Sequence, residues 1–571
     1  MKKTILIIAV FAFNLSLFGQ IDKPTLEDST PFSSKERTVL QTNADFVIAG
    51  EYLYYKLFTI DNNTLSTISK VGYVELVNAK KDVILQHKIK LIDGVGYSDF
   101  FIPSTVLTGM YKIVGYTNFS KNNINESYFA KDIFIVNPFT ANSQKVQDSL
   151  KTTATLNLRD AFPTENITHP LLSISTQKKE YSQRELISVN TEINDRIKSG
   201  NYSVSIRKLD SIEALNPISK NYVSVTSSDT LYIPEMRGEL ISGKITNTVN
   251  TLDVSSKYVA LSLPGKDYTF KVAKTNSNGA FFFNLNENSI SHRAIIQVIE
   301  KNKEDFKVQL QSLSSNNYNA LSFANLNIDS KLKQTIEARN IQNQIENAYY
   351  EEKRDSILPT AGPQLFYDGL GIKHELNAYT RFKTVRETFI EIVNQAGLRQ
   401  NSDGTHRFVV YDNVLNYDLI SSNLEPLLLV DGIIIQNNND VVFYDSKKIK
   451  SITVVQGQYI YGSKVFEGII DIETIAQDFK TSIKGAFFIE KDLKKLEPQK
   501  KYFQPEYSNT TLLNNRIPDY RRQLLWVPEI SKNETQFKAY TSDVKGVFEV
   551  KLEGLNNLGT FISTSTFIEV K

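Results

Sequence analysis

The side chains that most often carry catalysis are few in this sequence, and they lack the spacings that such chemistry needs. The chain has five histidines and no cysteine. No two histidines are four residues apart, the spacing that places two ligands of one metal on a helix face, and no HExxH occurs. Without cysteine there is no thiol nucleophile and no thiolate zinc site. We therefore expect no catalytic residue, no metal site and no cofactor.

Motifs that bind phosphate or activate a serine are absent as well. The sequence has no GxSxG and no complete phosphate-binding loop. The nearest approach is GQYIYGSK at 457–464, where Ser463 occupies the position of the required lysine. The carboxylates Glu351, Glu352 and Asp355 lie at the end of a charged, helix-like segment, and a solvated helix face accounts for them. The sequence therefore predicts a noncatalytic protein.

Composition and charge indicate an ordinary multidomain globular protein. The chain has 571 residues, of which 41% are hydrophobic and 22% are charged. It is too long for one hydrophobic core, so several domains are expected. The net charge of +2 is near neutral, so it does not indicate binding to nucleic acid or to an anionic membrane. Nucleic acid is therefore not an expected partner.

The N-terminal residues 1–19 have the pattern of a secretory signal peptide. Lys2 and Lys3 precede an apolar stretch from Ile5 to Leu17, and Gly19 offers a cleavage point. The alternative is a membrane anchor, but the stretch is shorter than the roughly 20 residues that span a bilayer. We expect an exported protein with no transmembrane segment of its own after cleavage. It would lie in the periplasm, at the outer membrane or on the cell surface of a Gram-negative bacterium, because a cysteine-free chain of this size fits such an envelope protein better than a small eukaryotic secreted module.

Four segments show the short, turn-separated alternation that is typical of β-sandwiches. They are 36–138, 168–232, 237–312 and 520–571. In the first, Val74 and Leu76 are expected on one face of a strand and Tyr73 on the other. In the third, Asn278-Gly279 predicts a hairpin turn. The sequence thus predicts a mainly β fold, built as a string of sandwich domains.

Two further segments depart from this pattern. Residues 329–358 place apolar side chains every four or five positions among charged ones, which predicts a helical connector with Ser330 as its N-cap. That helix either packs on its own protein or offers a face to a partner. Residues 364–475 mix helix-like and strand-like runs, which predicts one α+β domain.

The α+β segment resembles the plug domain of TonB-dependent outer-membrane receptors. The stretches EPLLLVDGIII (425–435) and DSKKIKSITVVQGQYIYGSKVFEGIIDIET (445–474) carry the resemblance. Its matching positions include Asp431, Gly432, Tyr461, Gly462, Gly468 and Thr474. Glycines at these places can supply the positive φ of a tight turn and allow sharp reversals. The resemblance implies a small sheet whose motif is structural or docks on another protein. An unrelated α+β domain with ordinary turns is the alternative.

The resemblance does not extend to a receptor barrel. The residues after 475 are too few for a large barrel with strands about ten residues long, and their patterns are those of soluble sandwiches. No convincing TonB-contacting box occurs near residues 20–35. We therefore do not expect the chain itself to be a transporter. The expected partner is an outer-membrane β-barrel protein or another envelope protein complex.

The flanking segments resemble macroglobulin-type domains of the alpha-2-macroglobulin superfamily. In 36–138 the matching positions are Gly50-Glu51, Tyr73–Leu76, Gly109, Tyr111, Tyr116 and Thr117, with departures at Val47 and Gly115. The segment 168–232 resembles the start of a second such domain. In 520–571 the matches are Trp526, Pro528, Phe548, Gly554 and Gly559. The segment 237–312 is similar to carboxypeptidase-regulatory-like sandwiches.

The resemblances imply architecture and leave two functions open. A protease-trapping macroglobulin needs a Cys–Gln thioester, which a chain without cysteine cannot form. The first hypothesis is a noncatalytic accessory or scaffold protein of the outer membrane that contacts other proteins through its sandwiches and plug-like domain. The second is a secreted or surface module that binds a glycan or a peptide. Asp431 and Tyr461 are the residues with which docking would be tested.

Overall fold

The structure is a computed structural model. It describes residues 34–144, 153–163, 165–215, 222–224, 231–248, 252–285, 291–311, 316–359, 362–411, 424–509, 513–514, 516–531 and 533–571. The predicted signal peptide lies outside these residues. The predicted fold class is confirmed: β-sandwiches dominate, joined by one α+β unit and one long helix. None of the helices described is long and apolar enough to cross a membrane.

The first sandwich is built mainly from residues 37–136, with two short strands added from later in the chain. One sheet contains β1 (Arg37–Thr42), β3 (Tyr52–Asp61), β4 (Thr64–Leu65) and β7 (Val95–Phe101). The other, seven-stranded sheet contains β2 (Phe46–Ile48), β5 (Val71–Val77), β6 (Val83–Lys90), β8 (Gly109–Tyr116), β9 (Tyr128–Val136), β16 (Tyr222–Val223) and β33 (Leu496–Glu497). Strand β5 is buried on both faces, since Val74 and Leu76 enter the sandwich core and Tyr73 packs in a second cluster outside it.

The second sandwich, here called the split sandwich, combines two segments that lie far apart in the sequence. Its first sheet is β11 (Leu172–Thr176), β13 (Leu186–Ile193) and β36 (Gln536–Tyr540). Its second sheet is β12 (Glu180–Tyr181), β14 (Asn201–Lys208), β35 (Gln523–Val527), β37 (Gly546–Leu555) and β38 (Phe561–Val570). Strand β14 pairs with β37 on one side and β35 on the other. The segments 168–232 and 520–571, predicted as separate pieces, therefore share both sheets and one core.

A layer containing the long helix covers the outer face of the first sandwich. The layer comprises β10 (Thr153–Leu158), β15 (Ile212–Leu215), β23 (Asn325–Ile328) and α2 (Lys333–Ala348). Leu332, which directly precedes α2, and Ile336 of α2 share a hydrophobic cluster with Phe46 of β2, so the helix packs on its own protein. Ser330 is not the N-cap, because it lies inside a short 3-10 turn whose cap is Asp329.

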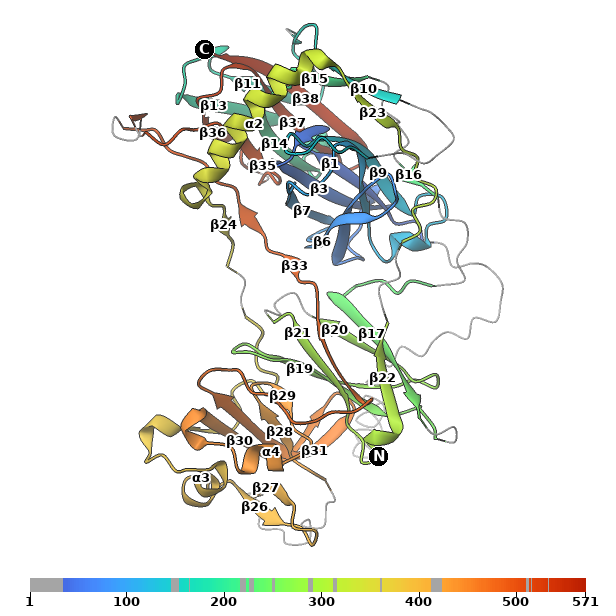
Figure 1. The fold of residues 1–571 in the computed structure, drawn as a ribbon, viewed down its shortest axis with the longest axis vertical. Coiled ribbons are helices and arrows are strands. Elements are labelled where there is room, and N and C mark those ends of the chain that lie inside the picture. Colours follow the sequence, from blue (N-terminus) through green and yellow to red (C-terminus); the bar gives the residue numbers. More distant parts are fainter. Residues whose placement is uncertain are drawn as a thin grey trace, which may run out of the picture.

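The third sandwich lies in the other half of the molecule (Figure 1). Its sheets are β17 (Glu239–Asn247), β20 (Ala280–Leu285) and β22 (Phe306–Leu310), and β18 (Tyr258–Leu263), β19 (Thr269–Lys274), β21 (Arg293–Val298) and β32 (Phe488–Asp492). Gly279 has the positive φ of 75° expected of a turn. The prediction of a hairpin there is wrong, however, because the turn joins β19 and β20, which belong to different sheets.

The α+β unit packs against the third sandwich (Figure 1). Its five-stranded sheet has the order β25 (Ile372–Glu375), β30 (Ile449–Tyr461), β31 (Lys464–Thr474), β28 (Leu427–Val430), β29 (Ile433–Ile434). The helices α3 (Val385–Glu391) and α4 (Asn439–Val442) and the hairpin of β26 (Ala396–Gln400) and β27 (His406–Val410) complete it. The chain then leaves through β33 and the pair of β34 (Lys500–Lys501) with β24 (Ser356–Ile357) to reach the split sandwich.

The shared core of the split sandwich generates a prediction. Phe548 of β37 has 0% exposure, and Phe548→Ala should cost about 3–5 kcal/mol by loss of buried surface and by the cavity left behind. We expect faster amide hydrogen exchange in β13 and β14, because those strands share its core. Leu558→Ala, at a position that is 68% exposed, is the control. Unchanged exchange in β13 and β14 with faster exchange in β37 alone would contradict a shared core.

Candidate functional site

The predicted motif residues are placed by two turns of the α+β unit. The Asp-Gly turn joins β28 to β29, with Leu429 opposite Ile434. Both turn residues have positive φ, 50° at Asp431 and 81° at Gly432, which suits a two-residue hairpin loop. Gly462, with φ of 60°, turns the chain between β30 and β31. These turns were anticipated from the sequence because their residue types are locally required.

Asp431 ties the ends of two neighbouring strands together. Its side chain accepts hydrogen bonds from the backbone N–H of Thr474 at 2.7 Å and from the Thr474 hydroxyl at 2.7 Å. The backbone N–H of Phe479 donates a third, at 3.2 Å. Asp431 is 3% exposed, and a buried carboxylate with three donors is well satisfied. These contacts describe a clip that holds β28 to the end of β31.

The other motif residues face the third sandwich or the interior of the sheet. A Cβ on Gly432 would lie 2.3 Å from the ring of Tyr268, so only glycine allows this close approach. The Tyr461 hydroxyl donates to the carbonyl of Phe270 at 2.7 Å. Gly468 makes no reversal, contrary to expectation: it lies within β31 opposite an irregularity of β30, at a φ of 81°. The surface predicted for docking is thus largely covered by the chain itself.

A cleft of about 380 Å³ opens between the third sandwich and the α+β unit, with Asp471 among its lining residues. The hydroxyls of Tyr268 and Tyr367 both donate to Asp471 Oδ2, each at 2.7 Å. Burial raises the pKa of Asp471 to about 6, although the hydrogen bonds from the two tyrosines act to lower it. Sequence reasoning missed Asp471, although an acidic residue inside the apolar run GIIDIET of β31 was a usable signal.

Two lysines of this cleft are paired with glutamates. Lys450 Nζ lies 2.8 Å from Glu473, and Lys373 Nζ lies 2.8 Å from Glu375. Asp431 also lines the cleft, but its oxygens are held by the clip. Among the described residues no group of three or more His, Asp or Glu side chains is placed to hold a metal ion. The arrangement joins the third sandwich to the α+β unit through the Tyr268 hydroxyl and the Asp471 carboxyl.

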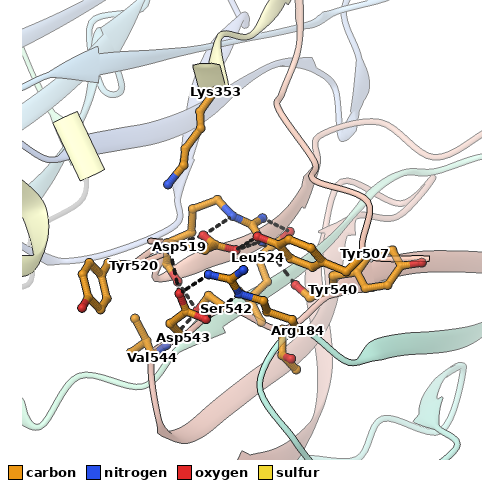
Figure 2. A network of polar contacts seen from close by, with 12 residues as sticks. Arg184, Lys353, Tyr507, Asp519, Tyr520, Leu524, Tyr540, Ser542, Asp543 and Val544 are labelled. Carbon is orange, nitrogen blue, oxygen red and sulfur yellow. Dashed lines mark hydrogen bonds and ion pairs between the residues drawn. The ribbon is translucent and has the colours of Figure 1, made fainter. Parts of the chain in front are cut away.

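A second polar network lies where the two segments of the split sandwich meet (Figure 2). Arg184 holds Asp543 through two hydrogen bonds of 2.8 Å, and Arg521 holds Asp519 in the same bidentate way. The backbone N–H of Asp519 donates to Asp543 at 2.9 Å, which links the two pairs. Tyr507 donates to Asp519 at 3.0 Å. Bidentate pairs fix orientation as well as distance, so this network sets how the segments meet.

A third network fixes helix α2 between the first sandwich and the split sandwich. Arg339 of α2 lies 2.6 Å from Glu51 and 2.6 Å from Asp210. Arg522 reaches the same Asp210 oxygen at 2.8 Å. The three neighbouring guanidinium groups of Arg339, Arg207 and Arg522 hold the pKa of Asp210 well below its ordinary value, despite its burial. Removing one partner of such a buried cluster would leave an uncompensated charge.

Comparisons with known proteins give no family for the chain. No protein-family model matches it, and no curated protein matches it. Similar solved structures include Escherichia coli alpha-2-macroglobulin activated by porcine elastase, at 10% identity and a TM-score of 0.22, covering 94% of this chain and 44% of that one. Salmonella alpha-2-macroglobulin reacted with methylamine aligns at 9% identity and a TM-score of 0.21, covering 95% and 40%. The Escherichia coli adhesin FdeC aligns at 10% and 0.14, covering 52% and 65%.

These alignments do not decide function. This chain spans less than half the length of the two macroglobulins. Bacterial alpha-2-macroglobulins are among the aligned structures, but TM-scores this low carry no argument. The sandwich architecture rests on the strand pairings of the chain itself. The resemblances to receptor plugs and to carboxypeptidase-regulatory sandwiches stay predictions.

The Asp431 clip can be tested by a substitution that keeps the shape of the side chain. Asp431→Asn tolerates the positive φ but removes a carboxylate acceptor, so we expect local stability to fall by about 2–3 kcal/mol. Hydrogen exchange in β28 and β31 measures this. The control is Asp368→Asn, at an exposed residue that also has positive φ, 42°. Equal effects of the two substitutions would refute the clip.

Asp471 should make the contact between the two domains sensitive to pH. Because its pKa is raised from 3.8 to about 6 on folding, the folded state binds more protons than the unfolded state between these values. Its contribution to stability is therefore present at low pH and is lost as the pH rises through about 6. Asp471→Asn should remove this component, so the stability of wild type relative to the variant should fall from pH ~4 to pH ~7. Calorimetry of both proteins across this range measures it, and a constant difference would contradict the assignment.

Proposed function

We propose that the protein is an exported, noncatalytic scaffold of the bacterial envelope that binds an outer-membrane β-barrel protein or its complex through the α+β unit. The observation that carries the proposal is the open edge of the five-stranded sheet. Strand β25 stands at the end of the sheet, and its outer side pairs with no strand among the described residues. An edge strand offers backbone donors and acceptors to a strand of another chain.

The two edges of this sheet differ in a way that favours one of them for binding. At the β29 edge the third sandwich contacts the backbone directly: Ile434 N–H donates to Ser262 at 3.3 Å, and Gln297 donates to the Ile434 carbonyl at 3.1 Å. At the β25 edge, Leu370 and Ile372 are 55% and 47% exposed. The chain therefore closes one edge with its own sandwich and leaves the other available with apolar side chains beside it.

Contacts between the α+β unit and the third sandwich support the role of a scaffold. The Tyr268 contact to Asp471 and the Tyr461 contact to Phe270 fix the α+β unit on the third sandwich. A partner bound at β25 would then be held at a defined position relative to the sandwiches. The export that the proposal requires rests on the signal-like residues 1–19.

The proposal is tested by recovering the tagged full-length protein from its own envelope in mild detergent and identifying co-purifying proteins by mass spectrometry. We expect an outer-membrane β-barrel protein in stoichiometric amount. Ile372→Lys places a charge on the binding edge and should abolish that recovery. Ile460→Lys is the matched control, since Ile460 belongs to the same sheet and is 72% exposed but does not lie on β25.

Two results would count against the scaffold. Recovery of the protein alone, in a soluble periplasmic or released fraction, would remove the β-barrel partner. Equal loss of the partner in Ile372→Lys and Ile460→Lys would show that the β25 edge is not the binding surface. Circular dichroism of both variants verifies that each remains folded.

A further inference from the structure

A cavity of about 160 Å³ lies where the first sandwich, helix α2 and the split sandwich meet. Its lining includes Tyr54 of β3, Asn343 of α2, Trp526 of β35 and Tyr502, which directly follows β34. Four separate stretches of the chain thus line one cavity. None of these residues belongs to the cleft around Asp471, so this is a distinct feature of the molecule.

Aromatic rings form one wall of the cavity. The rings of Tyr54 and Tyr502 meet edge to face with centroids 5.0 Å apart, and the Tyr54 and Trp526 centroids are 6.0 Å apart. The ring centroid of Tyr52, also of β3, lies 6.4 Å from the ring centroid of Tyr54. Such a wall offers flat apolar faces, while the indole and phenol groups keep polar atoms at their edges.

Three polar atoms of lining residues find no hydrogen-bond partner among the described residues. They are the Tyr502 hydroxyl, the Trp526 indole Nε1 and the Arg522 Nε. Tyr502 is 8% exposed and Trp526 is 4% exposed. Buried polar groups are nearly always hydrogen-bonded, and each exception needs an explanation. Here the three residues that carry these atoms line the same cavity, and all three groups can donate a hydrogen bond.

The charges around the cavity indicate what kind of acceptor fits. Arg339 is paired with Glu51, Arg521 with Asp519, and Lys353 lies 2.8 Å from Glu346. Most of the lining cations are therefore committed, and a strongly charged anion such as a phosphate finds no free pair of cations. Ring oxygens, hydroxyls or a single carboxylate are acceptors that the unpartnered donors can serve.

We propose that this cavity binds one sugar ring of a glycan, with an apolar ring face against the Tyr54 and Trp526 wall and ring oxygens accepting from Tyr502, Trp526 and Arg522. Small-ligand sites commonly combine such aromatic walls with a few convergent polar groups. The site is independent of the β25 edge, so the scaffold and the sugar site can fail or succeed separately.

The chain carries its own reporter, since it contains a single tryptophan and that residue lines the cavity. The intrinsic fluorescence of the full chain is titrated with N-acetylglucosamine, galactose and glucuronic acid, and with short oligomers of each. We expect a saturable change for at least one probe. A response to the neutral sugars identifies hydroxyl acceptors, and a response to glucuronic acid alone identifies a carboxylate acceptor at Arg522. Either response supports the site.

Tyr502→Phe provides the specific variant. It removes only an unpartnered hydroxyl, so we expect the melting temperature to be unchanged or raised, while sugar affinity falls about tenfold through the loss of one hydrogen bond. Tyr379→Phe, at a position 46% exposed in the α+β unit, is the matched control and should bind like wild type. This combination separates a ligand-binding role from a structural one.

Either of two results overturns the proposal. The first is a folded wild-type protein whose tryptophan fluorescence responds to none of the probes, which would show that the cavity binds no sugar. The second is a fluorescence response that Tyr502→Phe and Tyr379→Phe leave equally intact. In both cases the pull-down outcome for the β25 edge would stand on its own.

Discussion

The pairing of β14 between β35 and β37 is the constraint on which the rest of the structure depends. Ser203 and Glu553, which are hydrogen-bonded across it, are separated by 350 positions in the chain. Everything between them, including the helix, the third sandwich and the α+β unit, is held between two parts of one sandwich. The entropic cost of closing such a loop grows only slowly with its length, but pairings this distant slow folding. The last residues of the chain are consequently required for a domain that begins near residue 168.

Buried polar networks specify how the domains meet. Arg184 with Asp543 joins the two segments of the split sandwich, and Arg339 with Asp210 and Glu51 places helix α2. Burying charges costs desolvation energy, so these pairs add specificity of position more clearly than they add stability. The lower half uses phenol hydroxyls instead, as Tyr268 does on Asp471. A protein without disulfides has in this way fixed several domain contacts by directional hydrogen bonds.

Local patterns predicted local structure well. Val74, Leu76 and Tyr73 lie on the faces that alternation assigns to them, and Asp431-Gly432 forms its hairpin, because side-chain direction and turn φ depend on adjacent residues. Asn278-Gly279 shows what local patterns leave undetermined. Its turn is present, yet the strands beside it enter different sheets, and that choice is made by the core they must cover.

The candidate sites show the same difference between what adjacent residues determine and what distant contacts determine. The sequence by itself determined a mainly β chain with one α+β unit and no recognisable catalytic motif, because composition, periodicity and turn residues express these properties locally. Only the tertiary structure decided that the motif around Asp431 is turned toward the third sandwich, that Asp471 receives two phenols, and that Tyr502, Trp526 and Arg522 border one cavity. These juxtapositions join segments that are distant in the chain, and no local pattern encodes which distant surfaces will bury each other.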